Sequence, residues 1–186
     1  GDKSIAVFKS PRDVKGVAIL SYAHKVESDD QWLYLPALKR VKRIASKNKS
    51  GPFLGSEFSF EDFSFQEVEK YEYTFIGEEV CKDLMCFVIE RRPLDPYSGY
   101  TKQLVWIDKE NYLVQKIYHY DRKSFHLKTQ TFEDYRLYKD SYWQPHMVKM
   151  INHQNGKSSI LMFEDVKLNT GFTDKDFSQN SLRRSR

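Results

Sequence analysis

The sequence predicts a mainly β protein, a long antiparallel meander whose sheet curves over a cavity. Aromatic residues are abundant, with 12 Tyr, 13 Phe and 3 Trp in 186 residues, and aromatic side chains favour the pleated surface of a sheet. Strand-like runs follow one another with short polar connections, which indicates antiparallel strands rather than βαβ units. Helix signals are few. The length suits one domain, which we assign to residues 1–186.

Eleven strands are expected, because each run of aromatic and β-branched residues ends at polar or turn-forming residues. The turn signals are clearest at 108–111, 139–141 and 155–157. The expected strands are 5–9, 17–25, 31–36, 40–45, 71–81, 85–92, 100–108, 113–121, 125–138, 143–152 and 158–168.

Short helical turns are expected between some of these strands. One lies before Gly16, which ends it. Ser59, followed by two acidic residues, has the pattern of a helix start. A single turn is expected at 173–178, and the tail 182–186 should be frayed.

Several strands are apolar on both faces. Leu104 and Trp106 point opposite to Val105 and Ile107 in an extended chain, because successive side chains of a strand alternate. Such a strand must meet something besides water on each side. A helix layer, a second sheet or the interior of a barrel would satisfy this. Since helices are few, we favour a curved sheet over a cavity.

The charge excludes one class of partner and leaves others open. The formal net charge of +4 is mild, and no nucleic-acid motif accompanies it, so we expect no nucleic-acid partner. Basic residues nevertheless form a run without acidic neighbours. Either this run is a solvated sheet edge protected by lysines, or it contacts an anionic lipid or an acidic partner. The run contains Lys39, Arg40, Lys42, Arg43, Lys47 and Lys49.

The sequence carries no catalytic or metal-binding motif. Its five histidines lack metal-ligand spacing, and it has no nucleophile elbow, phosphate loop or dinucleotide motif. The adjacent carboxylates at 29–30 and 61–62 should point apart. We therefore expect neither an enzyme nor a cofactor or metal site. Cys81 and Cys86 flank an expected hairpin turn, so they could form a disulfide or remain free thiols.

The segment 29–65 carries aromatic residues where a connection is normally polar. It joins an aromatic strand, the basic run and a glycine-punctuated piece with frequent phenylalanines. These side chains must cover something apolar, either the protein's own core or a hydrophobic ligand. Which of the two applies decides the function.

Two stretches of this segment carry a family signature. They are DQWLYLPALKRVKRI at 30–44 and GSEFSFEDF at 55–63. The loop SPRDVKG at 10–16, CFVIE at 86–90 and the Phe-Thr pair at 172–173 fit the same pattern. On these residues the chain resembles the LolA/LolB-like family of outer-membrane lipoprotein-sorting proteins.

The resemblance implies an unclosed (half) β-barrel of antiparallel strands, with a few short helices as lid or plug and an apolar cavity for lipid or lipoprotein acyl chains. It implies a carrier in the periplasm of a Gram-negative envelope, linked to an RND-type exporter or an outer-membrane acceptor. It also favours the Cys81–Cys86 disulfide. Family members carry an amino-terminal helix before the equivalent of Ile5, which this sequence lacks, so the cavity should be more open here.

A carrier of this kind needs apolar side chains around the acyl chain and charge at the rim. Lys39, Arg40, Lys42 and Arg43 are the expected rim for a headgroup or a partner. Two other functions compete: a non-enzymatic module that docks an envelope protein through its basic run, and a lipid-modifying enzyme, which the missing nucleophile–base pair disfavours. The side chains expected on the concave face or its lid are Trp32, Tyr34, Phe53, Leu54, Phe58, Phe60, Phe63, Trp106, Met147 and Phe163.

Overall fold

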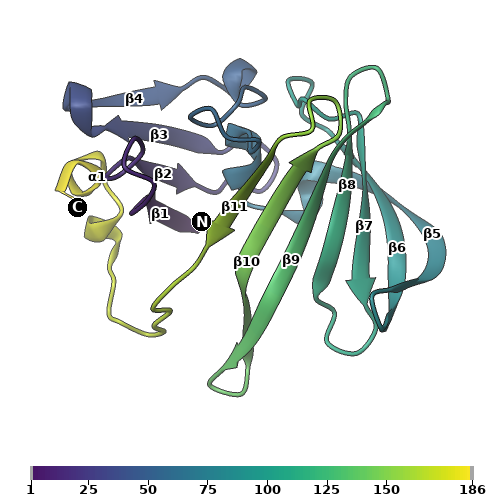
Figure 1. Ribbon diagram of the computed structural model, residues 1–186. Coiled ribbons are helices and arrows are strands. Elements are labelled where there is room, and N and C mark those ends of the chain that lie inside the picture. The colour runs from purple at the N-terminus through teal and green to yellow at the C-terminus, as the bar shows by residue number, and fades with distance from the viewer. Residues whose placement is uncertain (1, 185–186) are drawn as a thin grey trace.

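The computed structural model describes residues 2–184, whose strands form two antiparallel sheets (Figure 1). One sheet has four strands and the other has seven. The mainly β fold is confirmed, and neither sheet closes into a barrel. The strands divide between two sheets instead of forming one continuous curved sheet. No helix among the described residues is long and apolar enough to cross a bilayer.

The four-stranded sheet is built from the amino-terminal part of the chain. Its strands pair in sequence order, and each presents alternate residues to opposite faces. Ile19 and Leu33 point to the interior, whereas Leu20 and Trp32 point to the opposite face, against the carboxy-terminal segment. The strands are β1 (Lys3–Val7), β2 (Ala18–Tyr22), β3 (Asp30–Leu35) and β4 (Arg40–Ile44).

The seven-stranded sheet is a meander in which each strand pairs with the next along the chain. Each of the eleven expected strands overlaps one observed strand, although the last is shorter than the expected 158–168. The strands are β5 (Tyr71–Cys81), β6 (Leu84–Pro93), β7 (Lys102–Asp108), β8 (Val114–Tyr120), β9 (His126–Tyr138), β10 (Tyr142–Asn152) and β11 (Ser158–Met162).

Short helices lie in the connections. The expected helix start at Ser59 is confirmed: Ser59 caps the 3₁₀ helix η3 (Phe60–Phe63), and its backbone N–H and hydroxyl both donate to Asp62. The other short helices are η1 (Pro36–Leu38), η2 (Ser46–Asn48), η4 (Val68–Lys70), η5 (Asp174–Asp176) and the α-helix α1 (Gln179–Arg184).

The main core lies between the two sheets. Ile19 and Leu33 of the four-stranded sheet and Val17, which precedes β2, contribute to it, together with Val148 and Met150 of β10. Because these residues come from opposite ends of the chain, their burial ties the sheets into one unit. The segment 53–63 fills the space between them.

Cys81 and Cys86 are buried free thiols, so the disulfide favoured by the family resemblance is not formed. The strand register explains this. Cys81 pairs with Leu84 and Cys86 pairs with Glu79, which makes the cysteines diagonal neighbours on one face of the β5–β6 hairpin. Diagonal neighbours have Cα atoms about 7–8 Å apart, beyond the usual range for a disulfide.

The expectation of a frayed tail is wrong as far as the described residues reach. Leu182 is fully buried and packs on Ala18 and Leu20 of β2 from within α1. Residues 185–186 of the expected tail lie outside the described residues. The apolar outer face of the four-stranded sheet supplies the surface that holds α1 in place.

Candidate functional site

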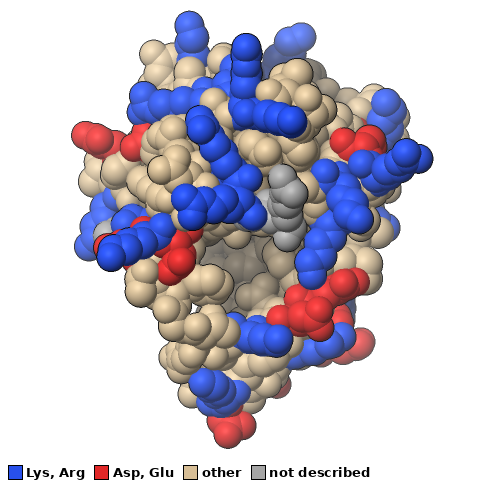
Figure 2. All heavy atoms as spheres, turned by 90° about the vertical axis from the view of Figure 1, so that its left-hand side faces the viewer, with Lys and Arg blue, Asp and Glu red and all other residues tan. Residues whose placement is uncertain are grey.

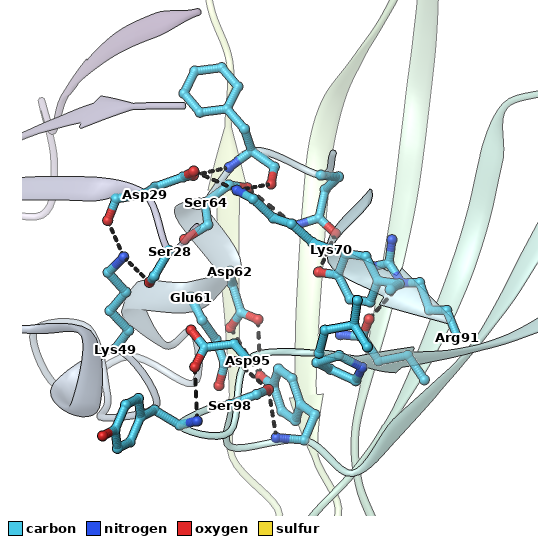
Figure 3. A pocket seen from close by; sticks show the side chains of 18 of the residues that line it. Ser28, Asp29, Lys49, Glu61, Asp62, Ser64, Lys70, Arg91, Asp95 and Ser98 are labelled. Carbon is cyan, nitrogen blue, oxygen red and sulfur yellow. Dashed lines mark hydrogen bonds and ion pairs between the residues drawn. The ribbon is translucent and has the colours of Figure 1, made fainter. Parts of the chain in front are cut away.

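A polar pocket of about 200 Å³ lies against the inner face of the seven-stranded sheet (Figure 3). Its walls come from the chain before β3, from η3 and η4, and from the inward side chains of β6 to β9. This volume is below the range of about 300–1,000 Å³ that is typical of pockets for whole small molecules. It would admit a small polar group rather than an entire lipid. Figure 3 shows Asp29 and Lys49 on one side of the pocket and Arg91 on the opposite side.

Asp29 anchors one wall of the pocket. Its side chain is fully buried and forms an ion pair with Lys70 at the end of η4. It also accepts hydrogen bonds from the backbone N–H of His24 (3.0 Å) and of Phe65 (2.7 Å). Lys49 donates to Ser28 and to the Asp29 carbonyl oxygen. These contacts hold three connecting segments against the start of β3.

Asp29 and Asp30 point apart, as the sequence predicts for adjacent residues of an extended chain. Asp30 lies on the outer side and accepts from Arg43 and His24. Its pKa is lowered, mainly by the hydrogen bond from Arg43. Two neighbouring carboxylates therefore have different environments, one in the pocket wall and one at the surface.

Glu61 and Asp62 form a second wall, and they too point to different partners. Glu61 accepts hydrogen bonds from the Ser98 hydroxyl (2.7 Å) and the Gly99 N–H (2.9 Å). Burial raises the pKa of Glu61 to about 7. A Cβ at Gly99 would lie 2.8 Å from the Glu61 carboxylate, so only glycine permits this close approach.

Asp62 has three donors. Besides its contacts with Ser59 in the helix cap, it accepts a hydrogen bond from the hydroxyl of Tyr100 at 3.0 Å. Tyr100 is buried, and burial raises its pKa well above the ordinary value. Tyr100 therefore remains a neutral donor, and the Asp62 carboxylate is satisfied within the protein.

His119 of β8 is fully buried as a neutral ring at the base of the pocket. Its Nδ1 lies 2.8 Å from the Gln103 amide nitrogen, and its Nε2 lies 3.1 Å from Gln130 Oε1. These partners define one tautomer, in which Nδ1 accepts and Nε2–H donates. Burial lowers the pKa of His119 to about 4, which keeps the ring uncharged at neutral pH.

Arg91 of β6 stands at the other side of the pocket with few partners. Its Nε donates to Gln103 Oε1 at 2.6 Å, and its guanidinium carbon lies 4.5 Å from the centroid of the Tyr71 ring. No carboxylate among residues 2–184 forms an ion pair with it. Burial lowers its pKa. The guanidinium therefore retains donors that face the pocket.

An exposed apolar surface continues from Arg91 along the same face of the sheet. Alternate residues of β6 share one face, so Ile89, Phe87 and Met85 follow Arg91 on the inner side. The register places Phe75 opposite Ile89, Val80 opposite Met85 and Ile107 opposite Phe87. We call this surface the apolar strip; it consists of Phe75, Val80, Met85, Phe87, Ile89, Ile107 and Tyr112.

The apolar strip is partly open to solvent despite its composition, with Phe87, Ile89 and Ile107 half-buried between more exposed neighbours. Phe75 is 61% exposed, Val80 65% and Tyr112 71%. The Phe87 ring lies between the rings of Phe75 and Tyr112, with centroids 6.3 and 6.5 Å away. From Arg91 to Met85 the strand advances six residues, or about 20 Å. This is the scale of an extended long acyl chain.

Asp108 fixes the far end of the apolar strip. Its carboxylate accepts hydrogen bonds from the N–H groups of Glu110, Asn111 and Leu113 at 2.7–3.1 Å. This arrangement closes the turn between β7 and β8 and places Tyr112 over Phe87. The aromatic end of the strip is therefore positioned by the backbone of a tight turn.

The structure brings together five of the ten side chains expected around an acyl chain. They fill the space between the sheets, with Phe53 3% and Phe58 1% exposed, and their rings are in mutual contact. We call this group the aromatic plug. It consists of Phe53, Leu54, Phe58, Phe60 and Phe63.

The other five lie elsewhere. Trp32 and Tyr34 pack on the outer face of the four-stranded sheet, and Tyr34 also lines a surface hollow of about 600 Å³. Trp106 packs with the two cysteines on the outer face of the seven-stranded sheet. Met147 and Phe163 line a hollow of about 380 Å³ beside β10. None of the ten lies on the apolar strip or lines the polar pocket.

The expected basic rim is exposed. Lys39, Arg40, Lys42 and Arg43 lie on or next to β4, the outermost strand of its sheet. Figure 2 shows Lys and Arg gathered over the upper part of the face on which β4 lies, above a hollow that Asp and Glu side chains also border. Lys49, from the same run, is instead buried against Ser28.

Sequence reasoning missed Arg91 and the apolar strip. A signal was present in β6, where Met85, Phe87 and Ile89 alternate and the series ends in Arg91. The polar residues of the pocket gave no comparable signal in the sequence. A histidine in a strand, such as His119, is normally expected at the surface. Its burial depends on distant residues, among them Tyr100, whose ring centroid lies 4.5 Å from that of His119.

The fold and site define an unclosed β half-barrel with a polar pocket beside an exposed apolar strip. A LolA superfamily protein from Nitrosomonas europaea has the same fold, with a TM-score of 0.74 at 23% identity, covering 97% of this chain and 78% of that chain. Comparison with sequence-family models gives a narrower assignment than this likeness of fold. A family model described as "Uncharacterized protein", that of the DUF1329-like family, matches residues 1–184, and the chain belongs to this family.

Two further crystal structures are similar over nearly the whole chain. A Vibrio parahaemolyticus domain named for outer membrane lipoprotein sorting has a TM-score of 0.95 at 52% identity, covering 99% of this chain and 78% of that chain. A DUF1329 family protein from Desulfovibrio piger has a TM-score of 0.90 at 28% identity, covering 97% and 76%. None of the curated proteins matches the chain.

Proposed function

We propose that the protein is a non-enzymatic carrier of a lipid, or of the acyl chains of a lipoprotein, in the periplasm of a Gram-negative envelope. The observation that carries this proposal is the apolar strip, an aromatic and aliphatic surface of which Phe75, Val80, Met85 and Tyr112 are exposed to water. The Lys109–Glu78 ion pair lies beside its centre, with Lys109 over the Phe87 ring. Exposed apolar surfaces of this kind mark binding sites. The name of the similar V. parahaemolyticus domain supports sorting toward the outer membrane.

The energetics of the apolar strip suit transient capture. Burial of ten acyl methylenes contributes about 8 kcal/mol before the cost of association is subtracted. A chain held on an open face buries only part of its surface, so the net gain is smaller. This permits release to an acceptor. The aromatic plug closes the interior beside the strip and keeps the two sheets apart.

The first experiment measures the binding of a fluorescent fatty acyl probe to delipidated protein. Saturable binding is expected, and Phe87→Ala should weaken it about tenfold because Phe87 lies at the centre of the apolar strip. Phe125→Ala is the control, since Phe125 is an exposed phenylalanine that lies away from the strip in the turn after β8. No saturable binding, or an equal loss in the control, would contradict the proposal.

A second candidate function rests on the basic rim. The rim lies on a free sheet edge with no acidic residue in the run, which suits docking to an anionic membrane or to an acidic envelope partner such as a transporter or acceptor. The double variant Arg40→Glu with Lys42→Glu should abolish salt-sensitive sedimentation with anionic vesicles while leaving acyl-probe binding unchanged. Unchanged sedimentation would remove membrane docking from the proposal.

A further inference from the structure

Among residues 2–184, two cations that line the polar pocket have no anionic partner, Lys49 and Arg91. Arg91 stands at the junction between the pocket and the apolar strip, and Gln103 accepts the hydrogen bond from its Nε. We propose that the amphiphile carried on the apolar strip has an acidic headgroup, a carboxylate or a phosphate, which binds the Arg91 guanidinium. This inference rests on the proposed function and names the class of ligand.

The ammonium groups of the two pocket lysines are already hydrogen-bonded within the protein, although only Lys70 is in an ion pair. Lys70 forms its ion pair with the buried Asp29 carboxylate. Lys49 donates to the Ser28 hydroxyl and to a backbone carbonyl oxygen. A guanidinium in such surroundings loses hydration, and an anion that binds it recovers part of that loss. Arg91 is therefore the pocket residue with the most to gain from an acidic ligand.

The carboxylates across the pocket do not compete for Arg91. Glu61 is satisfied by Ser98 and Gly99, and its raised pKa leaves it partly protonated at neutral pH. Asp62 accepts hydrogen bonds from Ser59 in its helix cap and from Tyr100 of the segment before β7. Both carboxylates are therefore hydrogen-bonded to other groups of the protein, and neither forms an ion pair with the Arg91 guanidinium.

The orientation of Arg91 suits a planar or tetrahedral anion. Tyr71 lies under the guanidinium plane and Gln103 holds its Nε, so the terminal amino groups are presented as a fixed fork. A fork of this kind matches carboxylate and phosphate oxygens. The pocket volume of about 200 Å³ accommodates a headgroup but no acyl chain.

The geometry of β6 would align the headgroup of the amphiphile with its acyl chain. Ile89 and Phe87 follow Arg91 at alternate positions of one uninterrupted strand, so the step from charge to apolar surface is about 7 Å. An amphiphile bound through its acid at Arg91 would extend along these residues toward Tyr112. One strand thus contacts both ends of the ligand.

The test compares three amphiphiles with the same twelve-carbon chain: laurate, dodecyl phosphate and the neutral dodecyl maltoside. Each is titrated into delipidated protein by calorimetry, and inorganic phosphate is titrated alone. Arg91→Gln should weaken laurate and dodecyl phosphate at least about tenfold, as expected for loss of a charged hydrogen bond, and should leave dodecyl maltoside unchanged. Arg91→Lys should restore part of the affinity.

Arg92→Gln provides the matched control. Arg92 is the next residue of β6, points to the opposite face and pairs with Glu90, so its loss removes the same charge from the same strand. It should leave the affinities for all three amphiphiles unchanged. Thermal unfolding of each variant separates loss of binding from loss of fold.

The outcomes separate this inference from the proposed function. If the acidic and neutral amphiphiles bind the native protein equally, or if Arg91→Gln weakens them equally, the acidic headgroup is ruled out while the carrier stands. If no amphiphile binds, the carrier itself fails. Inorganic phosphate that binds as tightly as dodecyl phosphate would overturn the inference too, because the site would then bind an anion without its chain.

Discussion

The two sides of the interior use the same residue type in opposite ways. On the side of the four-stranded sheet, Phe53 and Phe58 of the aromatic plug are almost completely buried; on the seven-stranded sheet, Phe75 is mostly exposed. The first group packs against residues from both sheets, whereas the second faces solvent along the apolar strip. The aromatic content of the chain therefore contributes to the core in one region and leaves an exposed apolar surface in the other.

The largest effect on stability is expected from truncating one phenylalanine of the aromatic plug, compared with one of the apolar strip. Phe58→Ala should lower the free energy of unfolding by about 3–5 kcal/mol, because it leaves a cavity between the sheets. Phe75→Ala should change it by less than about 1 kcal/mol, since little packing is lost. Urea denaturation of both variants measures the difference. A small effect of Phe58→Ala would show that the plug is not part of the stabilising core.

The adjacent aspartates give a second contrast. Asp29→Asn should cost about 3 kcal/mol, because it leaves Lys70 in the pocket wall without its ion pair. Asp30→Asn should cost less than about 1 kcal/mol, since the exposed Arg43 is screened by water. The same denaturation measurements apply. Equal costs would mean that the pocket wall adds no more to stability than a surface ion pair does.

A smaller effect is expected in the pH dependence of stability. Glu61 has a pKa of about 7, raised from an ordinary 4.5, so between these values the folded state holds more protons and stability falls as pH rises. His119 has a pKa of about 4, lowered from 6.5, so the unfolded state holds more protons in that window and stability falls as pH drops. In the native protein the two slopes oppose each other between about pH 4.5 and 6.5.

Single variants should separate the two slopes. Glu61→Gln should leave a protein that loses about 2–3 kcal/mol on acidification from pH 6.5 to 4.5, and His119→Gln should leave one that loses a similar amount as pH rises from 4.5 to 7. Thermal unfolding across this range measures both. Parallel curves for the native protein and both variants would contradict the assignment.

The strands could be predicted from the sequence because their signal is local. Alternation and turn residues located all eleven, and Ser59 marked the start of η3. The division into two sheets and the fate of each phenylalanine could not be predicted in this way. Phe58 and Phe75 lie in similar aromatic stretches of the sequence, but Phe58 is buried in a cluster with Val148 and Met150, far along the chain, whereas Phe75 is mostly exposed.

The site was harder to predict for the same reason. Ten side chains were expected around an acyl chain, and five of them gather in the core as the aromatic plug. The basic run was expected either at a solvated sheet edge or at a contact with an anionic partner, and it lies on or next to the edge strand β4. The polar pocket depends on residues that are distant in sequence, such as Asp29 with Lys70 and Gln103 with His119. A polar residue in a strand is predicted to be exposed to solvent. It becomes part of a pocket only where a connecting segment, distant in sequence, covers it.

The unbridged cysteines have a practical consequence. Cys81 and Cys86 lie under the outer face of the hairpin whose inner face carries the apolar strip, and burial raises the pKa of the Cys86 thiol. A thiol in this state reacts only when the strands around it separate. The rate at which an alkylating reagent labels these thiols therefore measures how often the hairpin opens. A ligand that spans β5 to β7 on the other face should lower this labelling rate.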